Sequence, residues 1–157
     1  MDPNTLEIQV EDPAGPDAQR LIQAFAQELG ERYGDEGPVV FSPEDLKGHG
    51  RAFLVARLKG EAVGCFAIGP FGAQEPKVSE ARGLFLMPAM RGQGLSRTLL
   101  RHLEEKAASM GYTTIRLVTG LRESEAIHLF VKGGYSRIPR FGPYAQRPLS
   151  VCFEKRL

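Results

Sequence analysis

Residues 84–96 read LFLMPAMRGQGLS, and this stretch decides how the rest of the chain is organised. The apolar run LFL predicts the end of a strand, which Pro88 stops because proline has no N–H to give to a neighbouring strand. Gly92 and Gly94 tolerate unusual dihedrals and have no Cβ to block an approaching anion. A helix that starts near Gly94 adds unpaired N–H groups and its positive end. The junction therefore predicts a site for phosphate groups.

Two common nucleotide-binding motifs fit this loop poorly. The dinucleotide-binding order G-x-G-x-x-G is broken by Arg97, which stands where the third glycine belongs. The triphosphate-binding loop needs Lys and then Ser or Thr directly after its last glycine, where this chain has Leu95 and Ser96. The remaining pattern, R-x-x-G-x-[G/A], is met by Arg91 and Gly94, with Ser96 as a variant in the last place.

Residues 52–153 resemble the GNAT superfamily of N-acetyltransferases. The resemblance rests on this loop and on the downstream TGLRESEAIHLFVKGGY, residues 119–135, which is similar to the family's second signature of a short helix followed by Gly and Phe or Tyr. It implies an α/β fold of the α+β type, with a mixed, mostly antiparallel sheet of six to seven strands, splayed after the fourth and flanked by helices. We expect residues 1–157 to form this single domain and to bind acetyl-CoA as the acetyl donor.

Alternating apolar residues predict strands, and apolar residues three and four positions apart predict helices. A Lys-Gly-Glu turn at Gly60 predicts a hairpin, and the crossover through the helix after the glycine loop makes the strands on either side of it parallel. The predicted strands are 5–10, 51–58, 62–68, 77–86, 114–118, 135–138 and 149–153. The predicted helices are 17–30, with Asp17 as cap and Gly30 as stop, then 43–47, 94–110 and 123–132.

Composition and charge narrow the classes of function. Apolar residues make up 42% of the chain and charged residues 25%, which is ordinary for a globular protein. No stretch approaches the length of a membrane span and the first residues lack a signal-peptide pattern, so we expect a cytoplasmic protein with no membrane partner. The basic residues are dispersed and the chain has no Trp, which argues against a nucleic-acid partner.

The charges sort along the chain. Residues 1–50 hold eleven Asp and Glu against three Lys and Arg, a net charge of −8, whereas residues 51–157 hold eight against seventeen, a net charge of +9. A positive C-terminal part suits a phosphate-bearing cofactor and an acidic N-terminal part suits an amine substrate, although sorted solvated faces give the same count.

Cysteine and histidine usage predicts no metal site. Cys65 and Cys152 lie in apolar runs without metal-ligand spacing, so we predict buried free thiols. His49, His102 and His128 are scattered along the chain and fit no metal spacing either.

The resemblance assigns contacts to acetyl-CoA. It implies that the pantetheine arm pairs with the strand end at Phe85 and Leu86, and that the Leu86 N–H polarises the acetyl oxygen. The main chain of residues 91–96 holds the diphosphate, and the Arg91 side chain binds either a phosphate or the helix end. The expected cofactor-binding residues are Leu84, Phe85, Leu86, Arg91, Gly92, Gln93, Gly94, Leu95, Ser96, Ser124, Ile127 and Phe130.

Glu80 is the candidate general base. Strand alternation predicts that it shares a face with Leu84 and Leu86, and many family members carry Glu at this position. Four strand residues span roughly 13 Å, so Glu80 is expected to act through water or to orient the amine. Arg82 is two residues away on the same face, and a structural ion pair between Arg82 and Glu80 is the alternative interpretation.

Phe130 departs from the family, which often has a Tyr there to protonate the leaving thiolate. Either the thiolate leaves without an enzyme acid, or Tyr144, Tyr135 or Ser124 takes this part. We expect Tyr144, because FGPYAQRP reads as a loop able to reach the site. Glu123 stands where the family often has Asn, so that role is not transferred.

These features predict an N-acetyltransferase that moves an acetyl group from acetyl-CoA to a primary amine of a small molecule or peptide by direct attack. The alternative is a non-catalytic acetyl-CoA-binding sensor or regulatory module, which Phe130 and Ser96 favour. Arg137, Arg140 and Arg147 either clamp a substrate carboxylate or the ribose phosphate of the cofactor, or are exposed loop arginines. Family analogy also leads us to expect a homodimer formed through an outer strand.

Overall fold

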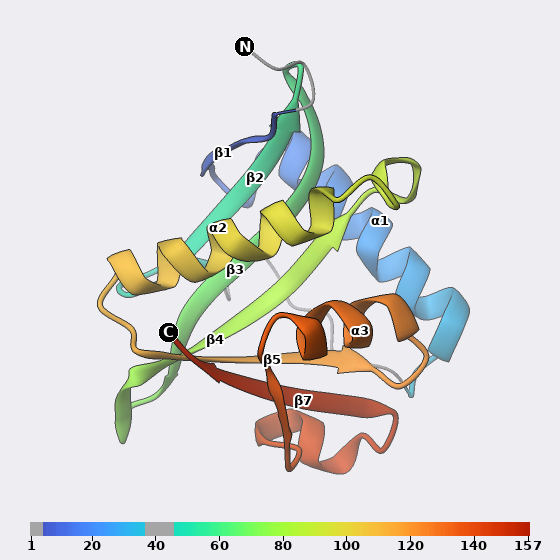
Figure 1. Ribbon diagram of the computed structural model, residues 1–157. Coiled ribbons are helices and arrows are strands. Elements are labelled where there is room, and N and C mark those ends of the chain that lie inside the picture. The colour runs from blue at the N-terminus through green and yellow to red at the C-terminus, as the bar shows by residue number, and fades with distance from the viewer. Residues whose placement is uncertain (1–4, 37–45) are drawn as a thin grey trace.

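The computed structural model describes residues 5–36 and 46–157, and a seven-stranded sheet forms its centre (Figure 1). The strand order is β1-β2-β3-β4-β5-β7-β6. Among the strands described, β4 and β5 pair in parallel and the other neighbours are antiparallel, which confirms the predicted mixed sheet. The strands are β1 (Glu7–Val10), β2 (Ala52–Leu58), β3 (Glu61–Gly72), β4 (Glu75–Leu86), β5 (Thr114–Gly120), β6 (Ser136–Ile138) and β7 (Ser150–Arg156).

Helices cover both faces of the sheet (Figure 1). On one face, α2 and α3 enclose a core that includes Leu103 of α2 and Ile115 of β5. On the other face, α1 packs Leu21 against Val55 and Phe85. None of the helices described combines the length and the apolar character needed to cross a membrane. The helices are α1 (Pro16–Tyr33), α2 (Leu95–Ser109), α3 (Ser124–Lys132) and the short 3-10 helices η2 (Pro88–Met90) and η3 (Gly142–Gln146).

The ends of α1 differ from the prediction. The helix starts after Gly15 with a proline in its first position, so Asp17 lies in the first turn rather than at the cap. It also continues through Gly30, because a glycine with helical dihedrals weakens a helix without ending it. The chain turns at Gly34, where φ is +60°. The turn predicted at 43–47 lies largely outside the described residues.

The strands β4 and β5 separate toward their carboxyl ends (Figure 1). They pair from Val78 opposite Thr114 to Ala81 opposite Leu117. Beyond this point β4 remains paired with β3 alone, and β5 remains paired with β7. The predicted splay after the fourth strand is therefore confirmed, and among the strands described none lies beside the end of β4 on this edge.

A β-bulge interrupts β4 just before the splayed end. Two residues of β4, Gly83 and Leu84, lie opposite a single residue of β3, Phe66. Gly83 has a φ of +65°, a conformation that glycine adopts without steric cost. Because a bulge bends its strand and increases the local twist, it directs the end of β4 away from β5.

The bulge reverses the alternation of side chains along β4. Ala81 and Leu86 both belong to the core beneath α2, although an odd number of positions separates them. Glu80 therefore faces the α1 side, where it forms an ion pair with Arg82 at 3.1 Å. The predicted ion pair is confirmed, but the prediction that Glu80 shares a face with Leu84 and Leu86 is wrong, because the extra residue of the bulge shifts the alternation by one.

Candidate functional site

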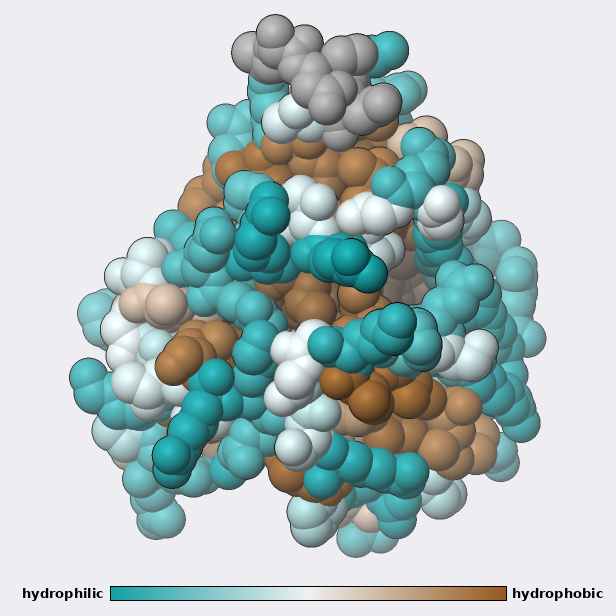
Figure 2. All heavy atoms as spheres, in the orientation of Figure 1, coloured by the Kyte–Doolittle hydropathy of each residue, from teal (hydrophilic) through white to brown (hydrophobic). Residues whose placement is uncertain are grey.

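The splay between β4 and β5 opens into a cavity of about 980 Å³. Its walls come from the second half of α1, the ends of β4 and β5, the first two turns of α2 and most of α3. Figure 2 shows hydrophobic atoms at the floor of the hollow between α2 and α3, with hydrophilic side chains along its rims. A concave, partly apolar cavity of this size is typical of a site for a small molecule.

Main-chain donors lie free at the rim where β4 leads into α2. The Arg91 N–H donates to the Pro88 carbonyl at 3.2 Å. For residues 92–97, no main-chain N–H has an acceptor among the residues that the structure describes. The first helical bond of α2 is the one from the Thr98 N–H to the Gly94 carbonyl, at 3.4 Å. These free N–H groups form the kind of array that binds a phosphate at a helix N-terminus.

Leu86 presents its main-chain groups to the open edge of β4. The Met87 N–H donates to the Val63 carbonyl of β3 at 2.7 Å. Because bonded positions alternate in an antiparallel pair, the N–H and C=O of Leu86 point away from β3. The Leu86 carbonyl accordingly accepts a hydrogen bond from Arg91 Nε at 2.9 Å. The same alternation turns the main-chain groups of Phe85 toward β3, so Leu86 rather than Phe85 offers them to a ligand.

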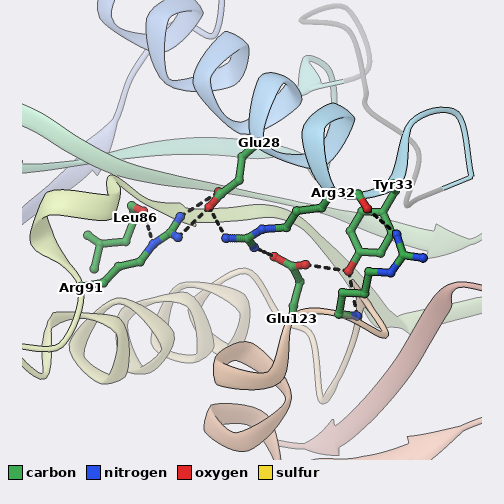
Figure 3. A network of polar contacts seen from close by, with 7 residues as sticks. Glu28, Arg32, Tyr33, Leu86, Arg91 and Glu123 are labelled. Atoms are coloured by element: carbon green, nitrogen blue, oxygen red, sulfur yellow. Dashed lines mark hydrogen bonds and ion pairs between the residues drawn. The ribbon is translucent and has the colours of Figure 1, made fainter.

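A chain of charged side chains crosses the cavity beside α1 (Figure 3). The Glu28 carboxylate accepts hydrogen bonds from both terminal nitrogens of Arg91, at 2.7 and 2.8 Å, and from Arg32 at 2.8 Å. Arg32 also pairs with Glu123. The Tyr33 hydroxyl donates to Glu123 at 2.6 Å. The network therefore links α1 to the loop after β4 and to the start of α3, which lie on the two sides of the splay.

These contacts fix protonation states in the network. The hydrogen bonds from Arg91 hold the pKa of Glu28 below its ordinary value and outweigh its partial burial. Burial, followed by the hydrogen bond to Glu123, raises the pKa of Tyr33 to about 12. At neutral pH Glu28 is therefore an anion and Tyr33 a neutral donor.

Most of the predicted cofactor-binding residues do surround this one cavity. Gln93, Leu95 and Ile127 do not line it. Gln93 is exposed, whereas Leu95 and Ile127 pack in the core beneath α2 and α3. The predicted residues at the cavity are Leu84, Phe85, Leu86, Arg91, Gly92, Gly94, Ser96, Ser124 and Phe130.

Glu80 and Tyr144 lie near each other, outside the lining of this cavity. Both are buried, at 7% and 2% exposure. Burial and then the nearby Glu80 carboxylate raise the pKa of Tyr144 to about 12. The Tyr144 phenol is therefore protonated at neutral pH and able to donate.

The other residues considered as acids have different surroundings. Tyr135 donates to Glu104 at 2.8 Å, on the α2 side of the sheet. The Phe130 ring lies 5.7 Å from the Tyr135 ring and fills the core at the cavity wall. Ser124, at the first position of α3, lines the cavity. Of the three hydroxyl candidates, Ser124 alone lies at the cavity and Tyr144 alone lies near Glu80.

Both cysteines are buried free thiols, which confirms the prediction. Burial raises the pKa of Cys65 to about 12 and also raises the pKa of Cys152. Neither sulfur is a thiolate at neutral pH, and only a thiolate is a competent nucleophile.

The acidic side of the site was not predicted from the sequence. Glu28 and Arg32 are four positions apart on α1, a spacing at which side chains of a helix meet, and this signal was available. The contacts of Glu123 with α1 had no such signal, because about ninety residues separate the partners.

Comparisons with known proteins agree with this architecture. The family model described as "Acetyltransferase (GNAT) family" matches residues 18–135. The IAA acetyltransferase of Azospirillum brasilense is 34% identical over 147 residues, covering 94% of this chain and 95% of the relative. A crystal structure from Klebsiella pneumoniae, of an acyl-CoA N-acyltransferase by inferred activity, superposes with a TM-score of 0.77 at 32% identity and covers 98% of each chain. A GNAT family acetyltransferase from Elizabethkingia anophelis with acetyl-CoA bound has the same fold, with a TM-score of 0.67 at 16% identity and coverage of 97% and 98%.

Proposed function

The chain belongs to the acetyltransferase (GNAT) family and is an acyl-CoA-dependent N-acetyltransferase, and on this premise we propose that it transfers the acetyl group of acetyl-CoA to a primary amine of a small molecule or short peptide by direct attack. The observation that carries the proposal is that Leu86, with main-chain groups facing away from β3, lines the same cavity as Gly92, Gly94, Ser96 and Arg97, whose N–H groups lack an acceptor among the described residues.

The residues around the cavity fit acetyl-CoA part by part. The free N–H groups of residues 92–97 suit a diphosphate, since they add several donors to the positive end of α2. The splayed edge at Leu86 suits the amide groups of the pantetheine arm, which pair with a strand edge as another strand would. Acetyl-CoA supplies an already activated thioester, so the protein needs to orient the carbonyl and manage protons.

The Leu86 N–H is the proposed donor to the thioester oxygen. It points away from β3 and belongs to a strand that remains paired with β3 on both sides of the bulge. A fixed main-chain donor stabilises the charge that develops on this oxygen during attack, and removal of a comparable donor costs about 2.7–4 kcal/mol in the barrier. Its effect is largest because it is already oriented before the reaction starts.

Direct attack by the amine is favoured over a covalent enzyme intermediate. An acetyl-enzyme route would need a thiolate or a similar nucleophile at the cavity. Cys65 and Cys152 are the two cysteines of the chain, and burial keeps both protonated. Neither of them lines the cavity between β4 and β5.

Glu80 and Tyr144 are proposed to handle the protons. Glu80 faces the α1 side of the sheet, and its pairing with Arg82 keeps the carboxylate oriented. Since Glu80 is off the cavity lining, it acts on the amine through water. Tyr144 remains a neutral phenol and so can donate to the leaving thiolate or hold the same water.

A thiol-release assay tests the proposal. Wild-type protein and acetyl-CoA are mixed with amino acids, polyamines, aminoglycosides and short peptides, and release of CoA is followed. Glu80→Gln should lower kcat by about 10²-fold or more, and Glu75→Gln, at the other end of β4, serves as the matched control. Unchanged rates in Glu80→Gln would remove the base assignment. Calorimetric binding of CoA without release on any amine would instead indicate a non-catalytic module.

A further inference from the structure

A second cavity, of about 500 Å³, lies between β6, η3 and the start of β7. It shares no lining residue with the cavity between β4 and β5. Arg137, Arg140, Ser150 and Cys152 are among its lining residues, and none of the described residues that line it is Asp or Glu. The proposed acetyl-donor site does not use any of these four side chains, so nothing above assigns this cavity to the binding of acetyl-CoA.

The arginines of this cavity have no partner among the residues described. Arg137 and Arg140 are exposed, and neither forms a hydrogen bond or an ion pair with a residue that the structure describes. By contrast, Arg57, Arg91 and Arg116 each contact a carboxylate. A guanidinium group without a counter-charge at a cavity favours an anionic ligand. Arg140 is the better placed of the two, because Arg137 is opposite Phe153 and its side chain therefore starts on the α3 side of the sheet.

Ser150 adds an independent observation. Its side chain is fully buried, and its hydroxyl has no hydrogen-bond partner among the described residues. Buried hydroxyl groups are nearly always partnered, so an orphan one at a cavity wall indicates a missing ligand or water. A hydroxyl and a guanidinium group together are donors that match the oxygens of a carboxylate or a phosphate.

The cavity lies on the same face of the sheet as Glu80. Glu80 is opposite Arg116 on β5, and Arg116 is opposite Glu154 on β7. Cys152 is two positions from Glu154 on that strand and therefore shares its face. Burial is the main cause of the raised pKa of the Cys152 thiol, and the charges of Glu80, which raises this pKa, and of Arg140, which lowers it, also act on the thiol, as this proximity requires.

We propose that this cavity binds the acidic group, a carboxylate or a phosphate, of the amine acceptor. The inference rests on the proposed function, and it adds the class of substrate. Two strand spacings and two residues along a strand separate Glu80 from Cys152, which amounts to roughly 12 Å. An acceptor that reaches from the reaction to the cavity is therefore at least about three residues long when it is an extended peptide.

Matched acceptors test the carboxylate and the phosphate separately. The first pair is triglycine and triglycine amide, and the second pair is glycyl-glycyl-phosphoserine amide and glycyl-glycyl-serine amide. In the thiol-release assay, the acid of at least one pair should have a KM about tenfold or more below that of its neutral partner. Arg140→Gln should abolish this difference and leave the KM of the neutral peptides unchanged. Arg156→Gln, on an exposed arginine at the end of β7, is the matched control.

A binding experiment without acetyl-CoA separates this inference from the proposed function. Sodium malonate is titrated into the wild-type protein and the amide NMR signals of Ser150 and Cys152 are followed. Saturable changes in the chemical shifts of these two amides, weaker in Arg140→Gln, would support the cavity as a binding site for anionic oxygens. This result would hold even if no amine were acetylated. Equal KM values for acid and neutral peptides in both pairs, or the absence of saturable shifts at these two residues, would overturn the inference while leaving acetyl transfer intact.

Discussion

The carboxylate of Glu28 accepts hydrogen bonds from both terminal nitrogens of Arg91, at 2.7 and 2.8 Å, and joins α1 to the loop that leads into α2 (Figure 3). Arg91 uses its third nitrogen for the Leu86 carbonyl, at 2.9 Å. The arginine of the glycine loop therefore connects the proposed oxyanion donor to the acidic side of the site. Its charge is already balanced within the protein.

Replacing Glu28 by Gln should destabilise the protein in a pH-dependent way. The pKa of Glu28 is lowered from 4.5, chiefly by the hydrogen bonds from Arg91, so its contribution to stability is complete above pH 4.5 and disappears as the pH falls through the folded-state pKa. We expect a loss of about 1–3 kcal/mol in the free energy of unfolding at pH 7, and a smaller difference at acidic pH. Urea denaturation at several pH values measures it.

The control for this experiment is Glu105→Gln. Glu105 is an exposed residue of α2 whose ion pair with Arg101 is long, at 3.9 Å, so its loss should hardly change stability. A difference between wild type and Glu28→Gln that is the same at neutral and acidic pH would contradict the charged pair as its cause.

Local sequence patterns predicted most of the fold because each pattern reports burial along a single element. The apolar spacing in residues 94–110 describes only the face that α2 buries, and that face is buried whatever the rest of the sheet does. The bulge at Gly83 had no such signal. The alternation of apolar and polar residues in the sequence does not mark the extra residue, and the left-handed dihedral of Gly83 is set by the pairing with β3.

The parts of the candidate site that are formed by main-chain groups could be predicted from the sequence. The contacts between side chains could be predicted less well. The glycine loop carries its own signal, because Gly94 must adopt a φ of +81° to start α2. The contact between Glu28 and Arg91 joins residues 63 positions apart, and no spacing in the sequence relates them. The bulge places Glu80 on the face of the sheet opposite to the predicted one. The one extra residue of the bulge is therefore the reason that the orientation of the proposed base was predicted wrongly.

Gly120→Ala should destabilise the junction of β5 and α1. A Cβ at position 120 would overlap the Tyr33 hydroxyl, which is held by Glu123 and by the Arg122 N–H. We expect a loss of about 1–3 kcal/mol, seen as a Tm lower by several degrees. Gly72→Ala, where a Cβ meets nothing within 4 Å, should change Tm little.

A second substitution identifies the cause of that loss. Tyr33→Leu removes the hydroxyl, so the double variant should be destabilised by less than the sum of the two single variants. Additive losses would mean that the overlap with Tyr33 is not what Gly120 avoids.

Gly94→Ala should weaken acetyl-CoA binding more than it weakens the fold. Gly94 has a φ of +81° and open space around it, so an alanine meets no atom but strains the backbone by about 1–2 kcal/mol. Relief of this strain turns the following N–H groups away from the diphosphate, and the KM for acetyl-CoA should rise about tenfold with a small change in kcat. Steady-state kinetics with varied acetyl-CoA measures this.

Gly30→Ala is the matched control for Gly94→Ala. Gly30 lies inside α1, where an added Cβ would meet no atom within 4 Å, and alanine favours helices over glycine by about 1 kcal/mol. This variant should be as active as wild type and slightly more stable. An unchanged KM in Gly94→Ala would show that the loop conformation does not matter for the donor.

Tyr144→Phe tests whether the buried phenol takes part in the reaction. The pKa of Tyr144 is raised to about 12, first by burial and then by Glu80, so the wild-type phenol remains a donor throughout the neutral and mildly alkaline range. Its loss should lower kcat by about 10²-fold and leave the KM for acetyl-CoA unchanged, because the ring stays in place while the proton is lost. Tyr112→Phe, which removes a buried hydroxyl bonded to the Gly50 carbonyl at 2.8 Å, should reduce stability without this fall in kcat. Equal kcat values for Tyr144→Phe and wild type would mean that Tyr144 does not protonate the leaving thiolate. Ser124, at the cavity wall, would then be the next hydroxyl to replace.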